Sequence, residues 1–456
     1  MLINHLLSCA IDLGFDKREV TLIQEENTMV TLSESADDMF SHSKCTSFIF
    51  RGVQNEKCIM FHSENCNVDT LSDQLEEAIN IQNRIGTSAP CNFNHIKILE
   101  KTVENTSKES NSLLLSNKAK EIYDTIDKKF NEMKNDENET IFIEQCCFGY
   151  LKYNNHIKNN LGFSYQRNED YYYSVLSLRM TCGNENYSIT NSRHGKDLFN
   201  MNTDDFISES LIAITSKANT QTIETGFYNI VFSNKVAAQL LDAFSPIFFA
   251  ENIRAGHSCL KNKIGQKIAS SVINLYDSGC CNYSSHIVEY DYEGTSVDEK
   301  ILIENGILKN YLYNSCAAAL DGKTAGGNSF MYDNQLGTNI TNFFIKPSDI
   351  KFKDLLNMDY GLFITEMSDL NGIVNFSTGD ISASISGFEI VNGEKRNAFD
   401  NAIMNSNICD MLKKIIALDS DIYFTMPDNV GSVGTPNMLV EGISITHLPT
   451  SERKDF

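Results

Sequence analysis

The sequence ENGILKNYLYNSCAAALDGKTAGGN, from Glu304 to Asn328, decides the fold of its part of the chain. Asn305-Gly306 lies between two apolar stretches, and this pair is typical of a two-residue hairpin turn. The GKT triplet further on suggests a phosphate-binding loop. That loop needs G-x-x-x-x-G-K-[ST], and Ala317 stands where the first glycine is required. We therefore predict a hairpin and a tight crossing within a sheet, where glycines allow close backbone approach.

Segments with the composition of strands surround this stretch. They are FYNIVFS (227–233), KILIENGILKNYLYN (300–314), GLFITEM (361–367), NGIVNFSTG (371–379), ISASISGFEIVNG (381–393) and PNMLVEGISIT (436–446). Apolar residues at helical spacing predict helices in 234–253 and 401–418. We predict that residues 223–456 form a β-rich domain with a large, mostly antiparallel, curved sheet and a few helices.

The first 222 residues predict two smaller units that combine helices with strands. The unit 1–103 contains a helix over 2–14, a hairpin over 19–35 that turns at Glu26-Asn27, two further strands and a helix over 70–86. A polar linker begins the unit 104–222, which contains a long amphipathic helix, two strands and a last helix over 204–219. The fold class is therefore α+β throughout.

Composition limits the possible partners. The 456-residue chain has a formal net charge of −22, so a nucleic-acid backbone would repel it, and we expect no nucleic-acid partner. No stretch has the length of a membrane span, and we expect no membrane partner. The thirteen cysteines are irregularly spaced and odd in number, which favours reduced thiols in a cytoplasm over a secreted disulfide framework.

Motifs of known catalytic chemistry are missing. No pair of the nine histidines has HExxH spacing, and G-x-S-x-G does not occur. The densest set of soft metal ligands is His257, Cys259, Cys280, Cys281 and His286, which could bind zinc if folding brought the five together. Free cysteines commonly behave as small buried hydrophobes, so this set is an alternative and not the leading interpretation.

Four blocks, in order, resemble the TldD/PmbA family, also called modulator of DNA gyrase and classed as peptidase family U62. The first is 300–329, with its hairpin turn and its closing G-K-T-A-G-G-N. The others are GIVNFSTGDISASISGFEIVNGE (372–394), NICDMLKKIIALDSDI (407–422) and NVGSVGTPNMLVEGISI (429–445). The likeness spans nearly the whole chain, but it is specific only in the last 230 or so residues.

The resemblance implies two kinds of subunit. The TldD type holds a catalytic metal with HExxxH and a late cysteine, and the TldE or PmbA type lacks these ligands and pairs with a TldD-type subunit. IGQKIAS (264–270) resembles a TldD-type block, and counting back from it puts the motif on Leu241, Asp242 and Pro246, with the late cysteine at Val430. Three of these four side chains offer a metal no ligand. The chain thus looks like the TldE type, and the resemblance places zinc only in a TldD-type partner.

The resulting expectation is a non-catalytic subunit of a heterodimeric metallopeptidase that cleaves unfolded peptides. One alternative is a stand-alone hydrolase that uses the divergent Cys/His set. The other is a homodimeric peptide-binding protein without peptidase activity. Metal content and the effect of Cys259→Ser separate the first alternative from the leading expectation.

Overall fold

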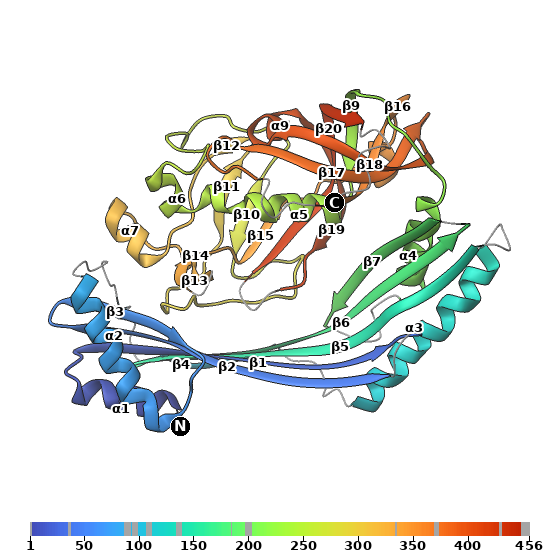
Figure 1. The fold of residues 1–456 in the computed structure, drawn as a ribbon. Helices are drawn as coiled ribbons and strands as arrows, with labels where there is room; N and C mark the ends of the chain where they lie inside the picture. The colour runs from blue at the N-terminus through green and yellow to red at the C-terminus, as the bar shows by residue number, and fades with distance from the viewer. Residues whose placement is uncertain are drawn as a thin grey trace. The chain divides into compact units, whose positions relative to one another are not determined.

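The chain forms two compact units, Met1–Ala218 and Asn219–Phe456. The computed structural model describes residues 2–34, 38–85, 93, 99–105, 112–133, 139–183, 185–196, 203–332, 335–368, 374–427 and 431–447. Each unit has its own sheet and its own hydrophobic core, and both combine helices with largely antiparallel strands (Figure 1). The α+β class with large curved sheets is therefore confirmed.

The first unit is built on one seven-stranded sheet, in the order β3-β2-β1-β5-β6-β4 with β7 paired to β6. Its pairs are antiparallel except for β4 with β6. Its elements are α1 Leu2–Asp12, β1 Lys17–Leu32, β2 Met39–Gln54, β3 Lys57–Ser63, η1 Val68–Thr70, α2 Leu71–Ile85, β4 Leu99–Asn105, α3 Ser112–Met133, β5 Glu139–Asn159, β6 Phe163–Cys182, β7 Glu185–Gly195 and α4 Thr203–Lys217.

Two apolar clusters lie at opposite ends of these long strands. Figure 1 shows α1 and α2 at one end and α3 and α4 at the other. Val20 of β1 packs in the cluster under α1 and α2, whereas Val30 of the same strand packs in the cluster under α3 and α4. The strand β1 therefore contributes side chains to both clusters. This differs from the predicted division into 1–103 and 104–222, because β1 and β5, which lie on either side of that boundary, pair along most of their length.

The hairpin predicted over 19–35 is wrong, because β1 runs through the expected turn without a break. Glu26 lies opposite Lys44 of β2 and opposite Lys152 of β5. The pairing of β1 with both neighbouring strands continues through this position, and it outweighs the local turn preference of Glu26-Asn27. The helices predicted at 2–14, 70–86 and 204–219 are present within a few residues of their expected ends.

The second unit holds an eleven-stranded sheet, in the order β12-β11-β10-β15-β20-β9-β16-β17-β18-β8 with β19 paired to β20. Its strands are β8 Thr220–Gln221, β9 Gly226–Phe232, β10 Leu275–Ser278, β11 Lys300–Glu304, β12 Ile307–Leu308, β15 Asn342–Ile345, β16 Tyr360–Ser368, β17 Asp380–Val391, β18 Glu394–Asn407, β19 Ile415–Phe424 and β20 Ser432–His447. A separate ribbon pairs β13 Ser329–Tyr332 with β14 Gln335–Thr338.

An additional pairing between β18 and β20 closes a ring of five strands within this sheet. The helical elements of the unit are α5 Asn234–Phe244, η2 Ser245–Phe248, α6 Ala250–Ala255, α7 Ser315–Asp321, α8 Phe352–Leu355 and α9 Ile408–Lys414. Residues of α5 join those of the ring in the largest apolar cluster of the chain, so this helix is fixed against the sheet.

The helix predicted over 401–418 is largely wrong. Only Ile408–Lys414 is helical, because the residues before it belong to β18 and those after it to β19. Asn407 ends β18 and caps α9, since its side chain accepts a hydrogen bond from the Cys409 amide. The strand predicted over 371–379 is also not found where it can be checked, since 374–379 is a turn and 371–373 lie outside the described residues.

None of the helices in the described part of the chain combines the length and the apolar character that a membrane span needs.

Candidate functional site

The segment that the sequence predicts to correspond to the family's metal motif lies at the end of α5. Ser233 caps this helix by accepting a hydrogen bond from the Val236 amide. Leu241 is buried in the main core, where its side chain packs with apolar neighbours. Asp242 is exposed, and it is the only one of the aligned residues in this segment with a carboxylate. A zinc site needs three or four ligands that converge, so Asp242 cannot form one with the residues at these positions.

Pro246 lies in η2, directly after α5, and it is buried. Its carbonyl oxygen accepts hydrogen bonds from the Asn252 side chain at 2.8 Å and from the Phe249 amide at 3.2 Å. The Ser258 hydroxyl donates to the carbonyl of the adjacent Ile247 at 2.6 Å. Backbone hydrogen bonds and apolar packing thus occupy the place of the second motif histidine, and Pro246 offers a metal no side-chain donor.

The late cysteine position, Val430, lies outside the described residues. The residues that follow it, from Gly431, are described. Gly431 is buried, and a Cβ at this position would come within 2.7 Å of the Ile340 carbonyl oxygen. Ser432 donates its amide to the Thr341 carbonyl and its hydroxyl to the Thr425 carbonyl. The glycine that follows the aligned position is therefore explained by a close approach of two backbones.

The alternative set of five soft ligands is spread over different environments. His257 and Cys280 are exposed, Cys259 and Cys281 are half-buried, and His286 is fully buried. In the described part of the chain, no group of three or more His, Cys, Asp or Glu side chains is arranged to hold a metal ion. Cys259 lies instead beside Cys409, with 2.9 Å between the two Sγ atoms. Sequence spacing gave no signal for this pair, because 150 residues separate its members.

A buried polar network supports the quoted stretch 304–328. Glu251 of α6 accepts hydrogen bonds from the Asn314 side chain at 2.7 Å and from the Thr338 amide at 3.2 Å. Asn314 caps α7 by accepting from the Ala317 amide at 2.7 Å. Glu293 accepts hydrogen bonds from the amide and the hydroxyl of Ser315. The small-residue segment is therefore a short capped helix that two carboxylates hold in place.

A second part of this network is centred on Asp277, which is fully buried on β10. Its carboxylate accepts from the Thr341 amide at 2.7 Å and from the Asn328 side chain at 2.8 Å, and Lys300 Nζ lies 3.2 Å away. Lys300 also donates to the Gly326 carbonyl at 2.7 Å. The buried ion pair between Asp277 and Lys300, together with its hydrogen bonds, thus holds the glycine-rich loop in place.

The GKT triplet does not form a phosphate cradle. Gly322 ends α7 in the left-handed conformation, with φ of 62°, and Lys323 donates its amide back to the Ala318 carbonyl. The Lys323 side chain is exposed. The predicted hairpin and tight crossing are both present. β11 pairs with β12 across Asn305-Gly306, and a Cβ on Gly306 would come within 2.3 Å of the Ala269 carbonyl oxygen.

Asp291 is the most perturbed carboxyl group of the network. Burial, followed by the charge of nearby Glu293, raises the pKa of Asp291 to about 7. Three amides, those of Glu293, Thr295 and Ser329, donate to its two oxygens and oppose this rise. The group is fully enclosed, so its role is to order the surrounding loops. No sequence pattern indicated it, because its partners come from loops of unrelated composition.

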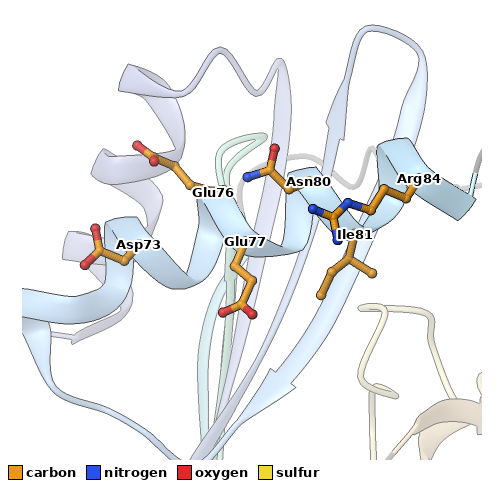
Figure 2. A pocket seen from close by; sticks show the side chains of 6 residues that line it. All are labelled: Asp73, Glu76, Glu77, Asn80, Ile81 and Arg84. Atoms are coloured by element: carbon orange, nitrogen blue, oxygen red, sulfur yellow. The ribbon is translucent and has the colours of Figure 1, made fainter.

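The first unit has a shallow hollow along α2 (Figure 2). Its described lining consists of Asp73, Glu76, Glu77, Asn80, Ile81 and Arg84, and all of these side chains project from this one helix. An exposed acidic helix face of this kind is the usual solvated surface of an amphipathic helix. We assign no ligand to it.

Comparison with solved structures defines the class of the whole chain. TldE from Thermococcus kodakarensis superposes with a TM-score of 0.81, over 98% of this chain and 100% of that one, at 18% sequence identity. The two chains therefore share a fold over nearly their whole length. The class is that of α+β proteins in which a unit of long strands precedes a unit with a larger mixed sheet.

Sequence comparison shows which proteins the second unit resembles. Residues 225–447 match the model of the PmbA/TldA metallopeptidase C-terminal domain. An uncharacterised protein of Methanocaldococcus jannaschii is 32% identical over 198 residues, 42% of this chain and 45% of that protein. The metalloprotease PmbA homolog of Haemophilus influenzae is 25% identical over 231 residues, 50% of this chain and 49% of the relative. The second unit is therefore similar to the C-terminal domain of the PmbA/TldA metallopeptidases.

The alignment spans about half the length of the curated relatives that it matches. The family resemblance seen in the four sequence blocks is confirmed. The assignment to the subunit type without metal ligands stays a prediction, as do the divergent metal set and the residues aligned with the motif.

Proposed function

We propose that this chain is a non-catalytic, TldE-type subunit, and that it assembles with a TldD-type metalloprotease subunit to cleave unfolded peptides in the cytoplasm. One observation carries the proposal. In the segment that aligns with the family's metal motif, the side chains of Leu241 and Pro246 are buried and apolar, and only the exposed Asp242 has a carboxylate. A peptidase metal must be held by several ligands with an open position for water, and this segment cannot supply them.

The fold supports the proposal in a second way. The chain keeps the whole fold of TldE from Thermococcus kodakarensis, although only 18% of the aligned residues are identical. The buried polar network around Asp277, Glu251 and Glu293 holds the second unit in one arrangement. A subunit with no chemistry of its own still needs such an ordered framework, because it must present a fixed surface to its partner.

Reconstitution with a catalytic partner tests the proposal. The partner is a TldD-type relative encoded in the same genome that carries HExxxH and the late cysteine. Each purified chain and their mixture are assayed with a fluorogenic unstructured peptide, and the zinc content of each sample is measured. We expect cleavage by the mixture and none by this chain alone, with zinc found in the partner.

Matched variants separate assembly from chemistry. Asp242→Ala in this chain should leave the activity of the mixture unchanged, because Asp242 is exposed and has no metal to bind. Replacement of the first motif histidine of the partner should abolish activity. Cleavage by this chain alone would contradict the proposal. So would near-stoichiometric zinc in this chain that is lost together with activity in Cys259→Ser. A homodimer that binds the peptide but never the partner would favour the binding-protein alternative.

A further inference from the structure

Two cysteines distant in sequence meet at the surface of the second unit. Cys259 follows α6, Cys409 lies in the first turn of α9, and their Sγ atoms are 2.9 Å apart. Both side chains are half-buried, so small solutes can reach them. The other described cysteines of this unit, Cys280, Cys281 and Cys316, have no sulfur partner of this kind among the described contacts.

The segment around Cys259 is held rigidly. Its amide donates to the Phe376 carbonyl at 2.9 Å, and the amide of His257 donates to the Asn252 carbonyl at 2.8 Å. Ser258 joins it to η2 through the hydrogen bond to Ile247. The position of the Cys259 sulfur is therefore set by several contacts, and it does not depend on a free loop.

Cys409 is equally fixed. Its amide donates to the Asn407 side chain at 3.0 Å, and the Asn407 amide group donates to the Thr378 carbonyl and to Asp380, both at 2.8 Å. The amide of Ile408 donates to the Gly379 carbonyl at 2.8 Å. Two rigid segments thus present their thiols to each other, and bonding the two sulfurs requires little movement of either backbone.

The charges around the pair favour a thiolate on one member. The hydrogen bond between the two thiols, helped by Lys263 and Lys413, lowers the pKa of Cys409 to about 7, against the effects of burial and of Asp410. The same hydrogen bond, together with burial, raises the pKa of Cys259. One sulfur is therefore prepared to attack while the other keeps its proton, which is the usual asymmetry of an attacking and a resolving thiol.

We propose that Cys259 and Cys409 form a peroxide-reactive dithiol that closes to a disulfide and links α9 covalently to the segment after α6. In the first step the Cys409 thiolate attacks one oxygen of a peroxide. The O–O bond breaks, Cys409 becomes a sulfenic acid, and the released hydroxide or alkoxide takes up a proton. In the second step Cys259 loses its proton, and its sulfur attacks the sulfenic sulfur and displaces water. The two thiols lose two electrons in total, and the peroxide is reduced by the same number.

The disulfide would act on the segment that contains Pro246. Cys259 is joined through Ser258 to η2, which contains Pro246 at the aligned position of the second motif histidine. An oxidised pair would therefore hold η2, α6 and α9 together in one cross-linked block. The reduced pair leaves their contact to hydrogen bonds and packing. This inference does not depend on the subunit role proposed above.

Peptide mapping of the full chain tests the dithiol. The reduced protein is treated with near-equimolar hydrogen peroxide, its remaining thiols are alkylated, and it is digested without reductant. We expect a cross-linked peptide that contains residues 259 and 409, lighter by two hydrogens than the sum of the two reduced peptides. Thiol titration should show the loss of both groups, and a reductant should restore both.

Variants and a control complete the test. Cys409→Ser should remove the linked peptide and leave Cys259 open to alkylation, whereas Cys280→Ser, which alters an exposed cysteine outside the pair, should leave the linked peptide at its wild-type yield. The wild-type map decides the question even if a variant folds poorly. The proposal is overturned if oxidised wild type lacks the linked peptide, or if Cys259 and Cys409 are oxidised separately to sulfinic acids.

Discussion

The two units of this chain reach a stable sheet by different means. In the first unit, β1, β2, β5 and β6 have 16, 16, 21 and 20 residues, and they pair in long, nearly unbroken registers. In the second unit several strands have only four residues, and the connections between them cross one another closely. The first arrangement needs a repeating pattern of apolar and polar side chains. The second arrangement needs particular residue types at the positions where its connections cross.

This difference explains where the family can be recognised. Alternating side chains can be exchanged for others of the same character without changing the sheet, so much of the first unit's sequence can vary, apart from buried polar groups such as the Arg51–Glu19 ion pair. A glycine at a backbone crossing, or a carboxylate that accepts several buried donors, has no equivalent substitute. The family model accordingly matches residues 225–447, within the second unit.

The largest predicted effect concerns Asp277 in the second unit. Asp277→Ala leaves Lys300, Asn328 and the Thr341 amide without their buried acceptor, and it should lower the free energy of unfolding by about 4 kcal/mol. The measurement is urea unfolding of the second unit, followed by a probe placed in it.

The control for this variant comes from the first unit. Glu121 on α3 pairs with Lys118 at 2.8 Å, but its side chain is 56% exposed. Glu121→Ala should therefore change stability by less than about 0.5 kcal/mol. Equal effects of the two substitutions would break the distinction between the units, because they would mean that the buried network adds no more than a surface ion pair.

A smaller effect is expected from a pair of glycines that both have positive φ at a turn. Gly306 in the second unit has φ of 79°, and an added Cβ would meet the Ala269 carbonyl oxygen at 2.3 Å. Gly183 in the first unit has φ of 60° and no atom within 4 Å of that position. Gly306→Ala should cost about 3 kcal/mol and Gly183→Ala about 1 kcal/mol, since only the first adds a backbone clash to the strain.

Thermal unfolding of the two glycine variants, with a separate probe in each unit, checks this pair. If the two alanines cost the same, the crossing at Gly306 adjusts without strain. The second unit would then tolerate substitutions as well as the first unit does.

The last prediction is a dependence of stability on pH. The pKa of Asp291 is raised to about 7 in the folded chain by burial and by Glu293, whereas an aspartate in an unfolded chain has a pKa of about 4. The folded state therefore binds the proton more tightly. The stabilisation is fully present below about pH 4 and is lost as the pH rises through about 7, at no more than ~1.4 kcal/mol per pH unit.

The comparison of Asp291→Asn with wild type isolates this contribution. Asparagine does not titrate, so the stability of the second unit should fall less steeply between pH 4 and pH 7 in the variant, whatever its absolute stability. Asp298→Asn, at an exposed position of the same segment, is the matched control and should keep the wild-type slope. Identical slopes in all three proteins would show that Asp291 does not bind its proton more tightly when the chain folds.

Much of the fold could be predicted because it rests on local patterns. The helix α5 and the strands β16, β17 and β20 follow directly from apolar periodicity and β-forming residues. The prediction at Glu26-Asn27 failed because β1 pairs with both neighbouring strands through this position, which local spacing does not reveal. The prediction over 401–418 failed because apolar residues spaced for a helix also fit a strand, a short helix and another strand in succession.

Some residues of the candidate site could likewise be predicted from the sequence, and others could not. Leu241, Asp242 and Pro246 are predicted by counting without a gap along the chain from a family block, and they stay predictions. The partners of Asp277, Asp291 and Cys409 could not be found, since each pair is joined only when distant segments fold together. The patterns in a single sequence predict helices and strands, but they do not predict the contacts between them.

The ring of five strands has a consequence for how the protein is made. Its member β9 pairs with β20, so that Gly226 lies opposite Ile445. Because the ribosome delivers the chain from its N-terminus, β9 must wait with one edge unpaired until more than two hundred further residues have emerged. The second unit therefore closes only after β20 has emerged, whereas β1 and β2 of the first unit can pair long before. A nascent chain would expose its β9 edge from the synthesis of β9 until that of β20, which makes this edge a natural place for a chaperone to bind.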